Sequence, residues 1–288
     1  MPDVWFPHLG IEIDHINRVA FSIFGLEIAW YGLIIALGVA GGLGLACLIA
    51  KKTGQKTETY TDFIIYALIF SILGARIYYV IFSWEYYAAN PLQIFNVRGG
   101  GMAIYGAVIA AVCTALIYCK VKKYDTWLLI DTAIPGLALG QAIGRWGNFC
   151  NQEVFGGYTD GLFAMRLNVE TAAYTTPELM EKAITEGGVT YIQVQPTFLY
   201  ESFGNLVLVV IMLLLWKKRK TPGVIFCTYL VGYGLLRFII EYIRTDQLML
   251  WGTNIPVSMA LSALLVIAGV VLYCILRKRN KARGCRTK

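Results

Sequence analysis

The sequence predicts an all-α, polytopic integral membrane protein of about seven transmembrane helices, with its N-terminus outside and its C-terminus in the cytoplasm. The first observation is composition: 57% of the 288 residues are hydrophobic and 15% are charged, whereas soluble domains average roughly 45–50% apolar and about 25% charged residues. The second is the grouping of apolar residues into long stretches, and the third is the grouping of basic residues between alternate stretches.

Seven apolar stretches are long enough to cross a bilayer, which takes about 20 residues in a helix. They run over 20–50, 61–83, 100–119, 126–146, 196–216, 222–243 and 254–276. Backbone polar groups in lipid need partners within their own segment, so we expect continuous helices there. We also expect residues 1–288 to form a single membrane domain that contains no strands.

The basic residues are sorted by side. Seventeen of the 25 Lys and Arg residues fall in four segments that seven crossings place on one face of the membrane, namely 51–56, 120–123, 217–220 and 277–288. The positive-inside rule makes that face cytoplasmic. The net charge of +7 therefore indicates topology, and we expect no nucleic-acid partner.

The longest connection, 148–195, is expected outside as an extracytoplasmic loop or small head region, because connections of this length are usually functional or partly ordered. Within it, we expect 170–188 to form a short surface helix. The seven cysteines show no paired framework or CxxC spacing, and the two histidines, His8 and His15, precede the first span. These patterns predict no disulfide scaffold and no metal site.

Arg145 lies inside a predicted span, where a charge costs about 3 kcal/mol or more and therefore needs a reason. It belongs to the stretch GRWGNFCNQEVFGG at 144–157. If the helix continues, Arg145, Asn148 and Gln152 share one face. A guanidinium beside carboxamides suits a phosphate or a carboxylate. The purely structural alternative is that Arg145 extends to the interface and pairs with Glu153.

A second charged cluster contains Arg237, Glu241 and Arg244, which spacings of four and three place on one helix face. A pair between Arg237 and Glu241 lowers the cost of both charges and leaves Arg244 as spare positive charge. Buried arginines without an excess of acids point to an anionic ligand. A third and weaker cluster consists of Arg76, the turn at 98–101 and Glu201.

The stretch at 144–157 resembles the signature of bacterial phosphatidylglycerol–prolipoprotein diacylglyceryl transferases, and the resemblance extends along nearly the whole chain. Shorter motifs follow in that family's order: Trp30 to Gly32, Gly100 to Gly106, Pro196 to Glu201 and Arg237 to Arg244.

The resemblance implies a seven-span enzyme of the bacterial plasma (inner) membrane with its active site toward the outer leaflet. The implied reaction moves an sn-1,2-diacylglyceryl group from phosphatidylglycerol to the lipobox cysteine thiol of a prolipoprotein. A thioether forms, and glycerol 1-phosphate leaves. The implied partners are phosphatidylglycerol, prolipoprotein signal peptides with a lipobox cysteine, and membrane lipid. No cofactor is implied.

The resemblance also assigns roles to single residues. Guanidinium groups aimed at the leaving phosphate stabilise the charge that grows there. The expected catalytic residues are Arg145, Arg237, Glu153, Glu241 and Tyr105. The expected substrate-binding residues are Tyr31, Arg76, Asn148, Asn151, Gly156, Glu201 and Arg244. Among the glutamates, the sequence does not distinguish a base from a residue that orients an arginine.

Two positions depart from the family's pattern. Many members have histidine where this chain has Tyr105, and again where it has Gln195. A phenol with a pKa of about 10 is a poor base at neutral pH but can hydrogen-bond a phosphate. We therefore expect Tyr105 to bind substrate, and the general base stays unassigned.

Three other functions remain open at this point. In-span arginine and glutamate also mark transport pathways, so one alternative is a small-anion transporter or channel. Another is a non-catalytic relative that binds lipid or lipoprotein. A third is a different phospholipid head-group transferase, which would share the arginines but not the signature.

Overall fold

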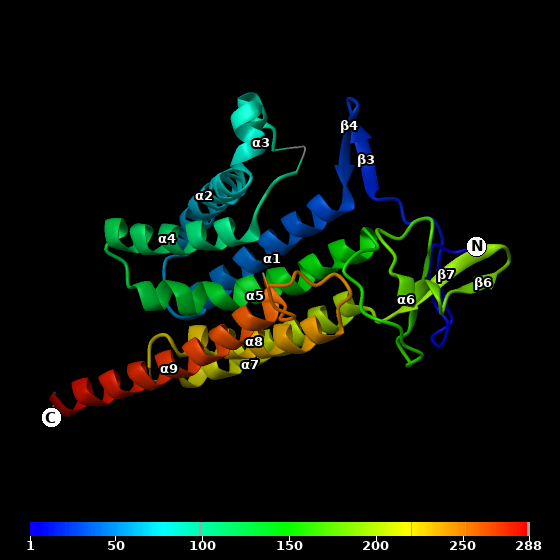
Figure 1. The fold of residues 1–288 in the computed structure, drawn as a ribbon. Coiled ribbons are helices and arrows are strands. Elements are labelled where there is room, and N and C mark those ends of the chain that lie inside the picture. Colours follow the sequence, from blue (N-terminus) through cyan, green and yellow to red (C-terminus); the bar gives the residue numbers. More distant parts are fainter. Residues whose placement is uncertain (98–99, 220, 251, 287–288) are drawn as a thin grey trace. The chain divides into compact units, whose positions relative to one another are not determined.

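A computed structural model describes residues 1–97, 100–219, 221–250 and 252–286. Arg98, part of the third predicted cluster, lies outside these residues. The chain divides into two compact units, the first formed by Met1–Gly42 with Ile134–Lys288 and the second by Leu43–Ala133. Each unit is described by itself, and Figure 1 labels most elements of both.

Seven helices in the described residues are long and apolar enough to cross a membrane. They are α1 (Trp30–Lys52), α2 (Thr57–Phe82), α4 (Ile104–Lys122), α5 (Thr126–Cys150), α7 (Thr197–Lys218), α8 (Val224–Ile243) and α9 (Val257–Arg286). Three short helices are α3 (Trp84–Ala89), the 3₁₀ helix η1 (Pro91–Phe95) and α6 (Pro177–Met180). The prediction of a mostly helical membrane protein with seven spans is confirmed.

The expectation that the chain has no strands is wrong. The strands are β1 (Val4–Phe6), β2 (Ile11–Ile13), β3 (Val19–Ile23), β4 (Leu26–Ala29), β5 (Met165–Asn168), β6 (Ile184–Glu186) and β7 (Val189–Val194). Five of them form one antiparallel sheet in the order β2-β1-β5-β7-β6. Hydropathy detects the spans, but it carries little information about these short strands outside them.

The surface helix expected at 170–188 is also wrong for most of its length. Only the four residues of α6 are helical, and the segment continues into the hairpin β6–β7. Gly187 and Gly188 have φ of 56° and 82°. A two-residue type I′ turn requires positive φ at both positions, and glycine adopts it without steric cost.

The first predicted span begins too early, because α1 starts at Trp30 and not near residue 20. Residues 19–29 form the hairpin β3–β4 instead. Its turn residues, Phe24 and Gly25, have φ of 51° and 76°. The run VAFSIFGLEIA is mostly apolar despite Ser22 and Glu27, so hydropathy alone merges the hairpin with the helix that follows.

In the first unit, α5, α7, α8 and α9 run side by side, and the five-stranded sheet lies at the end where α5 ends and α7 begins (Figure 1). This sheet and the loops around it are called the head. The head is held by its own apolar core, which includes Val4, Phe155, Leu167, Ile192 and Val194. Helices α1 and α5 approach closely at two pairs of glycines, Gly38 with Gly140 and Gly42 with Gly136.

In the second unit, α2 and α4 pack through glycines as well. A Cβ at Gly106 would lie 2.3 Å from the carbonyl oxygen of Gly74, so the two backbones are in contact there. Farther along, Tyr60, Tyr118 and Leu129 belong to a buried cluster. The contact between Gly74 and Gly106 fixes how the start of α4 lies beside α2.

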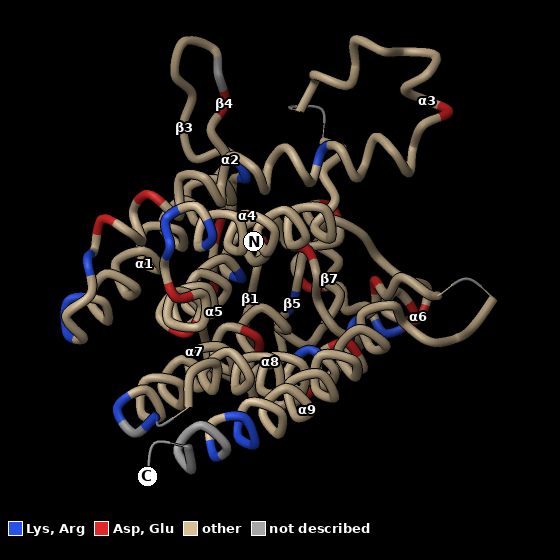
Figure 2. The backbone as a smooth tube through the Cα atoms, turned by 90° about the vertical axis from the view of Figure 1, so that its left-hand side faces the viewer, with Lys and Arg blue, Asp and Glu red and all other residues tan. Residues whose placement is uncertain are grey.

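Basic residues stand at one end of several membrane-spanning helices. In the first unit, Figure 2 shows blue segments at the neighbouring ends of α7 and α9. Asn280 Nδ2 donates to Thr221 Oγ1 over 3.2 Å there. In the second unit, Lys120 and Lys122 stand in the last turn of α4. The pattern supports a cytoplasmic face, and the orientation in the membrane stays a prediction.

Candidate functional site

The charged residues of the first unit meet where three helices adjoin the head. Arg145 stands in the last two turns of α5, Glu201 in the first turns of α7, and Arg237 and Glu241 in the last turns of α8. Arg244 directly follows α8. The chain reverses through the head between α5 and α7, which brings these helix ends to one side.

The side chains form an alternating series of positive and negative groups, called here the arginine–carboxylate ladder. Arg145 Nη2 lies 2.7 Å from Glu201 Oε2, and Glu201 Oε1 lies 3.6 Å from Arg237 Nη1. Arg237 Nη2 lies 2.6 Å from Glu241 Oε2, and that oxygen lies 3.9 Å from Arg244 Nε. The ladder ends at Asp246, whose carboxylate accepts two hydrogen bonds from Arg244.

Exposure separates the two kinds of charge. The side chains of Glu201 and Glu241 are 1% and 2% exposed, whereas those of Arg145 and Arg237 are 20% and 15% exposed. The carboxylates therefore lie behind the guanidinium groups and orient them. Of the guanidinium nitrogens of Arg145, only Nη2 contacts a carboxylate in the described part of the chain. The remaining N–H groups of Arg145 are available to an anionic ligand.

The ladder also contains buried polar atoms without a hydrogen-bond partner among the described residues. They are Glu201 Oε1, Arg237 Nη1, Glu241 Oε2 and, one turn farther into α7, Asn205 Oδ1. Such atoms are rare in folded proteins and need an explanation. Here they show that the ion pairs alone do not satisfy the site.

Two interpretations of these charges are corrected, and a third is confirmed. Arg145 pairs with Glu201 and not with Glu153. Arg244 is not spare, because Asp246 binds it through two atoms. Although burial disfavours its charge, Asp246 holds the pKa of Arg244 above its ordinary value. The pair between Arg237 and Glu241 is confirmed.

The signature continues past α5 as a strained loop. The helix ends at Cys150, so Gln152 does not share a helical face with Arg145, contrary to the expectation. Gln152 and Val154 have φ of 51° and 60°. A β-branched residue in this region is a steric outlier, and strain of about 1–3 kcal/mol persists only where the surroundings enforce it.

Glu153 stands between these two residues and faces back to the helix. Its Oε1 accepts hydrogen bonds from Asn148 Nδ2 at 3.0 Å and from Asn151 Nδ2 at 3.1 Å. The two predicted head-group amides are therefore anchored by a carboxylate of the same signature. Glu153 is the only one of the predicted glutamates that contacts no guanidinium in the described residues.

Gly156 ties the signature loop to the residues that precede α7 and follow α8. Its N–H donates to Gln195 O over 3.0 Å, and it pairs with Arg244 as an isolated β-bridge. A Cβ at Gly156 would lie 2.9 Å from both the Cβ of Gln195 and the carbonyl oxygen of Ile243. The position therefore requires glycine. A Cβ at the next residue, Gly157, would meet nothing within 4 Å.

Tyr31 lies against the signature helix. A Cβ at Gly147 would come within 2.7 Å of the Tyr31 ring, so the missing side chain makes room for it. Nearby, Trp146 Nε1 donates to Ser202 Oγ over 3.2 Å. A mostly apolar cavity of about 200 Å³ adjoins this pair, and Ile34 and Leu206 also line it.

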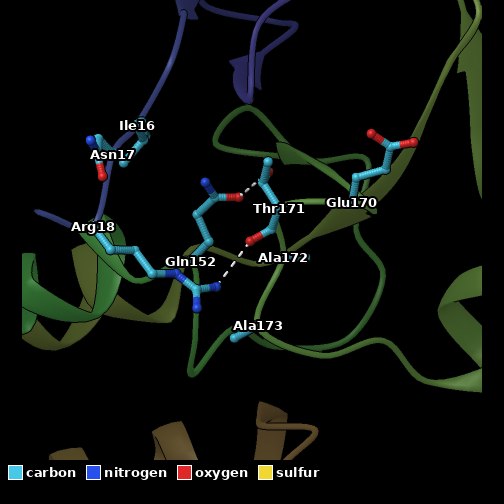
Figure 3. A pocket seen from close by; sticks show the side chains of 8 residues that line it. All are labelled: Ile16, Asn17, Arg18, Gln152, Glu170, Thr171, Ala172 and Ala173. Carbon is cyan, nitrogen blue, oxygen red and sulfur yellow. Dashed lines mark hydrogen bonds between the residues drawn. The ribbon is translucent and has the colours of Figure 1, made fainter.

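A second cavity, of about 450 Å³, opens in the head next to the signature loop (Figure 3). Its lining is polar. Thr171 Oγ1 donates to Gln152 Oε1 over 2.8 Å, and Arg18 Nη2 donates to the carbonyl oxygen of Thr171 over 3.1 Å. Figure 3 shows these side chains joined across the cavity wall, with Glu170 turned away from them.

Two predicted site residues belong to the second unit. Arg76 of α2 is buried and donates to backbone carbonyl groups of the segment before α4. Tyr105 stands in the first turn of α4, with its ring centroid 6.5 Å from that of Tyr78. Substrate binding by Arg76 stays a prediction, and this geometry does not favour it.

Several residues of the site were not anticipated from the sequence. They are Asn205, Ser202, Asp246, Arg18 and Thr171. For Asn205 and Ser202 a signal was available, because both are polar residues inside a predicted span at spacings of four and one from Glu201. The others lie outside the spans, where polar residues are ordinary. In the described residues, no group of three or more His, Cys, Asp or Glu side chains could hold a metal ion.

The fold and the ladder together define a class: a multi-pass membrane protein with a buried charged site where its helices meet a small β-sheet head. The chain belongs to the prolipoprotein diacylglyceryl transferase family, whose model matches residues 18–275.

Curated relatives agree with this family. A phosphatidylglycerol–prolipoprotein diacylglyceryl transferase of Finegoldia magna is 43% identical over 264 residues, which cover 91% of this chain and 97% of the relative. Proteins of the same name from Clostridium novyi and Bacillus cytotoxicus are 42% and 40% identical, and the matches cover 98% and 96% of those relatives. They cover 92% and 94% of this chain.

Proposed function

We propose that this protein transfers the sn-1,2-diacylglyceryl group of phosphatidylglycerol to the lipobox cysteine thiol of prolipoproteins. The sulfur–carbon bond forms as the carbon–oxygen bond to phosphate breaks, the thiol loses its proton, and glycerol 1-phosphate leaves. The names of the relatives support both substrates. The single observation that carries the proposal is the ladder, in which buried carboxylates direct partly exposed guanidinium groups outward.

Arg145 and Arg237 are the proposed phosphate contacts. The leaving phosphate gains negative charge in the transition state, and preorganised donors stabilise that gain selectively. Glu201 and Glu241 hold the two guanidinium groups at 2.7 and 2.6 Å, and Arg244 extends the same series. Removing one donor of this kind typically lowers the rate by about 10²–10³.

Glu153 is the carboxylate that we assign to the thiol proton. Glu201 and Glu241 each contact an arginine, so their carboxylates are already engaged in ion pairs. Glu153 instead accepts from the neutral amides of Asn148 and Asn151. These amides also contact the head group in the proposal.

The remaining parts of the site receive simple roles. Tyr31 packs on Gly147 near the start of the signature, and Gly156 permits the close backbone approach near its end. The apolar cavity beside Trp146 fits the start of an acyl chain. For Tyr105, which belongs to the second unit, substrate binding stays a prediction, with a hydroxyl where many members of the family have histidine. The protein works in the bacterial plasma membrane. The site faces the outer leaflet, and the helix ends that carry the basic residues face the cytoplasm.

The function is tested with purified protein, phosphatidylglycerol and a lipobox peptide. We expect release of glycerol phosphate together with the mass gain of one diacylglyceryl group on the peptide. A peptide with serine in place of the cysteine should stay unmodified, because a neutral hydroxyl is a much weaker nucleophile. Absence of turnover, beside an active relative as positive control, would refute the transferase.

The site is tested with two sets of variants. Arg145→Lys keeps the charge but loses the two-pronged contact, so kcat/KM should fall about 10²-fold. Gly156→Ala should lower it as well, because the new Cβ collides with backbone and side-chain atoms at 2.9 Å. Gly157→Ala is the matched control and should retain wild-type activity. Unchanged activity of Arg145→Lys would contradict phosphate binding there.

A further inference from the structure

Arg76 is a buried cation that no carboxylate neutralises among the described residues. It stands in α2 with 7% of its surface exposed. Instead of an acid, five backbone carbonyl oxygens surround its guanidinium group. Nε donates to Ile94, Nη1 donates to Gly100 and Gly101, and Nη2 donates to Gln93 and Asn96. An intramembrane arginine is commonly paired with backbone carbonyls in this way.

These bonds use every donor that Arg76 has. A guanidinium group carries five N–H groups, and each of the five contacts is made to a different carbonyl. Two of these bonds, to Ile94 and Gly100, are 2.8 Å long. The group is therefore occupied by the chain itself, and it ties residues 93–96 and 100–101 to α2.

The segment that Arg76 holds leads directly to Tyr105. Ala103 N donates to Ala75 O over 3.1 Å, which ties the start of α4 to the residue next to Arg76. Just beyond Tyr105, the backbones of Gly106 and Gly74 are in contact. Tyr105 is thus fixed between two ties to α2, and the first of them continues the contact made by Arg76.

We propose that Arg76 is a positioning residue, which sets the entry of α4 and so places the hydroxyl of Tyr105 for the transfer reaction. The inference rests on the proposed function. It differs from the substrate contact expected for Arg76. The guanidinium group binds backbone carbonyl groups of its own chain, and it affects the reaction only by positioning Tyr105.

A double-mutant cycle tests this coupling. Arg76→Lys keeps the charge, but an ammonium group has only three N–H donors and cannot bind five carbonyl groups. We expect kcat/KM to fall about tenfold, which a double-mutant cycle can resolve. Tyr105→Phe removes the hydroxyl and should cause a similar loss. In the double variant the two losses should not multiply. Independent, multiplicative losses would overturn the proposal, and so would wild-type activity of Tyr105→Phe.

A pair of glycine variants tests the same contact without changing Arg76. Gly100 and Gly101 have φ of 87° and 74°, so alanine is strained at both. A Cβ at Gly101 would lie 2.5 Å from Arg76 Nη1, whereas a Cβ at Gly100 meets nothing within 4 Å. Gly101→Ala should therefore reproduce the loss seen with Arg76→Lys, and Gly100→Ala should lose clearly less. Equal losses would contradict the role of Arg76.

Hydrogen exchange gives a readout that does not depend on turnover. In Arg76→Lys, amides of 93–97 and 100–103 should exchange faster, while those of the head should not change. Unchanged exchange in both stretches would show that Arg76 does not hold them. If wild-type protein shows no transfer, the proposed function fails, and the exchange experiment still decides whether Arg76 fixes the start of α4.

Discussion

At the scale of single residues, Glu201 joins the two halves of the charged site. One of its oxygens contacts Arg145 of α5, and the other faces Arg237 of α8. Its side chain is almost completely buried. Breaking a buried pair by removing one partner is costly, because the remaining charge keeps its desolvation penalty. Two arginines depend on this one carboxylate.

Glu201→Gln keeps the shape of the side chain but removes its charge. We expect the free energy of unfolding to fall by about 3–5 kcal/mol, and kcat/KM to fall because the guanidinium groups lose their orientation. The matched control is Glu186→Gln, which removes the more exposed partner of Arg166 at 2.8 Å. That pair should contribute about 1 kcal/mol or less. Thermal unfolding in detergent would measure both, and equal shifts would contradict the buried role of Glu201.

The sequence predicts contacts within a helix better than contacts between helices. The pair of Arg237 and Glu241 follows from a spacing of four residues, which fixes the distance between two positions of one helix. The contact of Arg145 with Glu201 depends on how α5 and α7 pack, and no periodicity within either helix determines it. For the same reason, the sequence does not predict that Asn205 Oδ1 is buried without a hydrogen-bond partner among the described residues.

At the scale of elements, close helix packing depends on glycine. A Cβ at Gly136 of α5 would lie 2.3 Å from the carbonyl oxygen of Gly42 in α1. Small residues let transmembrane backbones approach, and packing is a main source of stability where lipid removes the hydrophobic drive. The tyrosine that lies on Gly147 belongs to α1 as well, so this crossing supports the site.

Gly136→Ala should separate α1 from α5. Overpacking typically costs about 1–3 kcal/mol, so the midpoint of thermal unfolding should fall, and activity should fall with it. Gly44→Ala is the matched control, because a Cβ there meets nothing within 4 Å. It should be neutral or slightly stabilising, since alanine favours helix more than glycine does. A Gly136→Ala protein with wild-type unfolding behaviour would disprove the tight crossing.

Hydropathy locates the helices but not the strands between them. The predicted span at 222–243 matches α8 within two residues, because its length and polar flanks leave little freedom. The hairpin β3–β4 is missed because its strands are mostly apolar and directly precede an apolar helix. In the head, long-range pairing places β1 beside β5, and such pairing has no local signal in the sequence.

At the scale of the whole molecule, seven crossings together with the sorting of basic residues predict that the C-terminus lies in the cytoplasm. A fluorescent protein fused after residue 288 should therefore fluoresce, and alkaline phosphatase fused there should be inactive, because it folds only outside. An N-terminal epitope should be accessible to protease added to intact spheroplasts. An active phosphatase fusion would reverse the orientation and place the ladder on the inner side.

The ladder has a consequence for how the chain enters the membrane. Helix α8 carries Arg237 and Glu241 together, so it can neutralise itself as it is inserted. Helix α5 brings Arg145 and helix α7 brings Glu201, each without that partner, and an unpaired charge in a span costs about 2.5–3.5 kcal/mol on insertion scales. Strands β5, β6 and β7 of the head are synthesised between them. We therefore expect α5 to remain near the membrane surface until α7 arrives, so that biogenesis treats α5, the head and α7 as one unit.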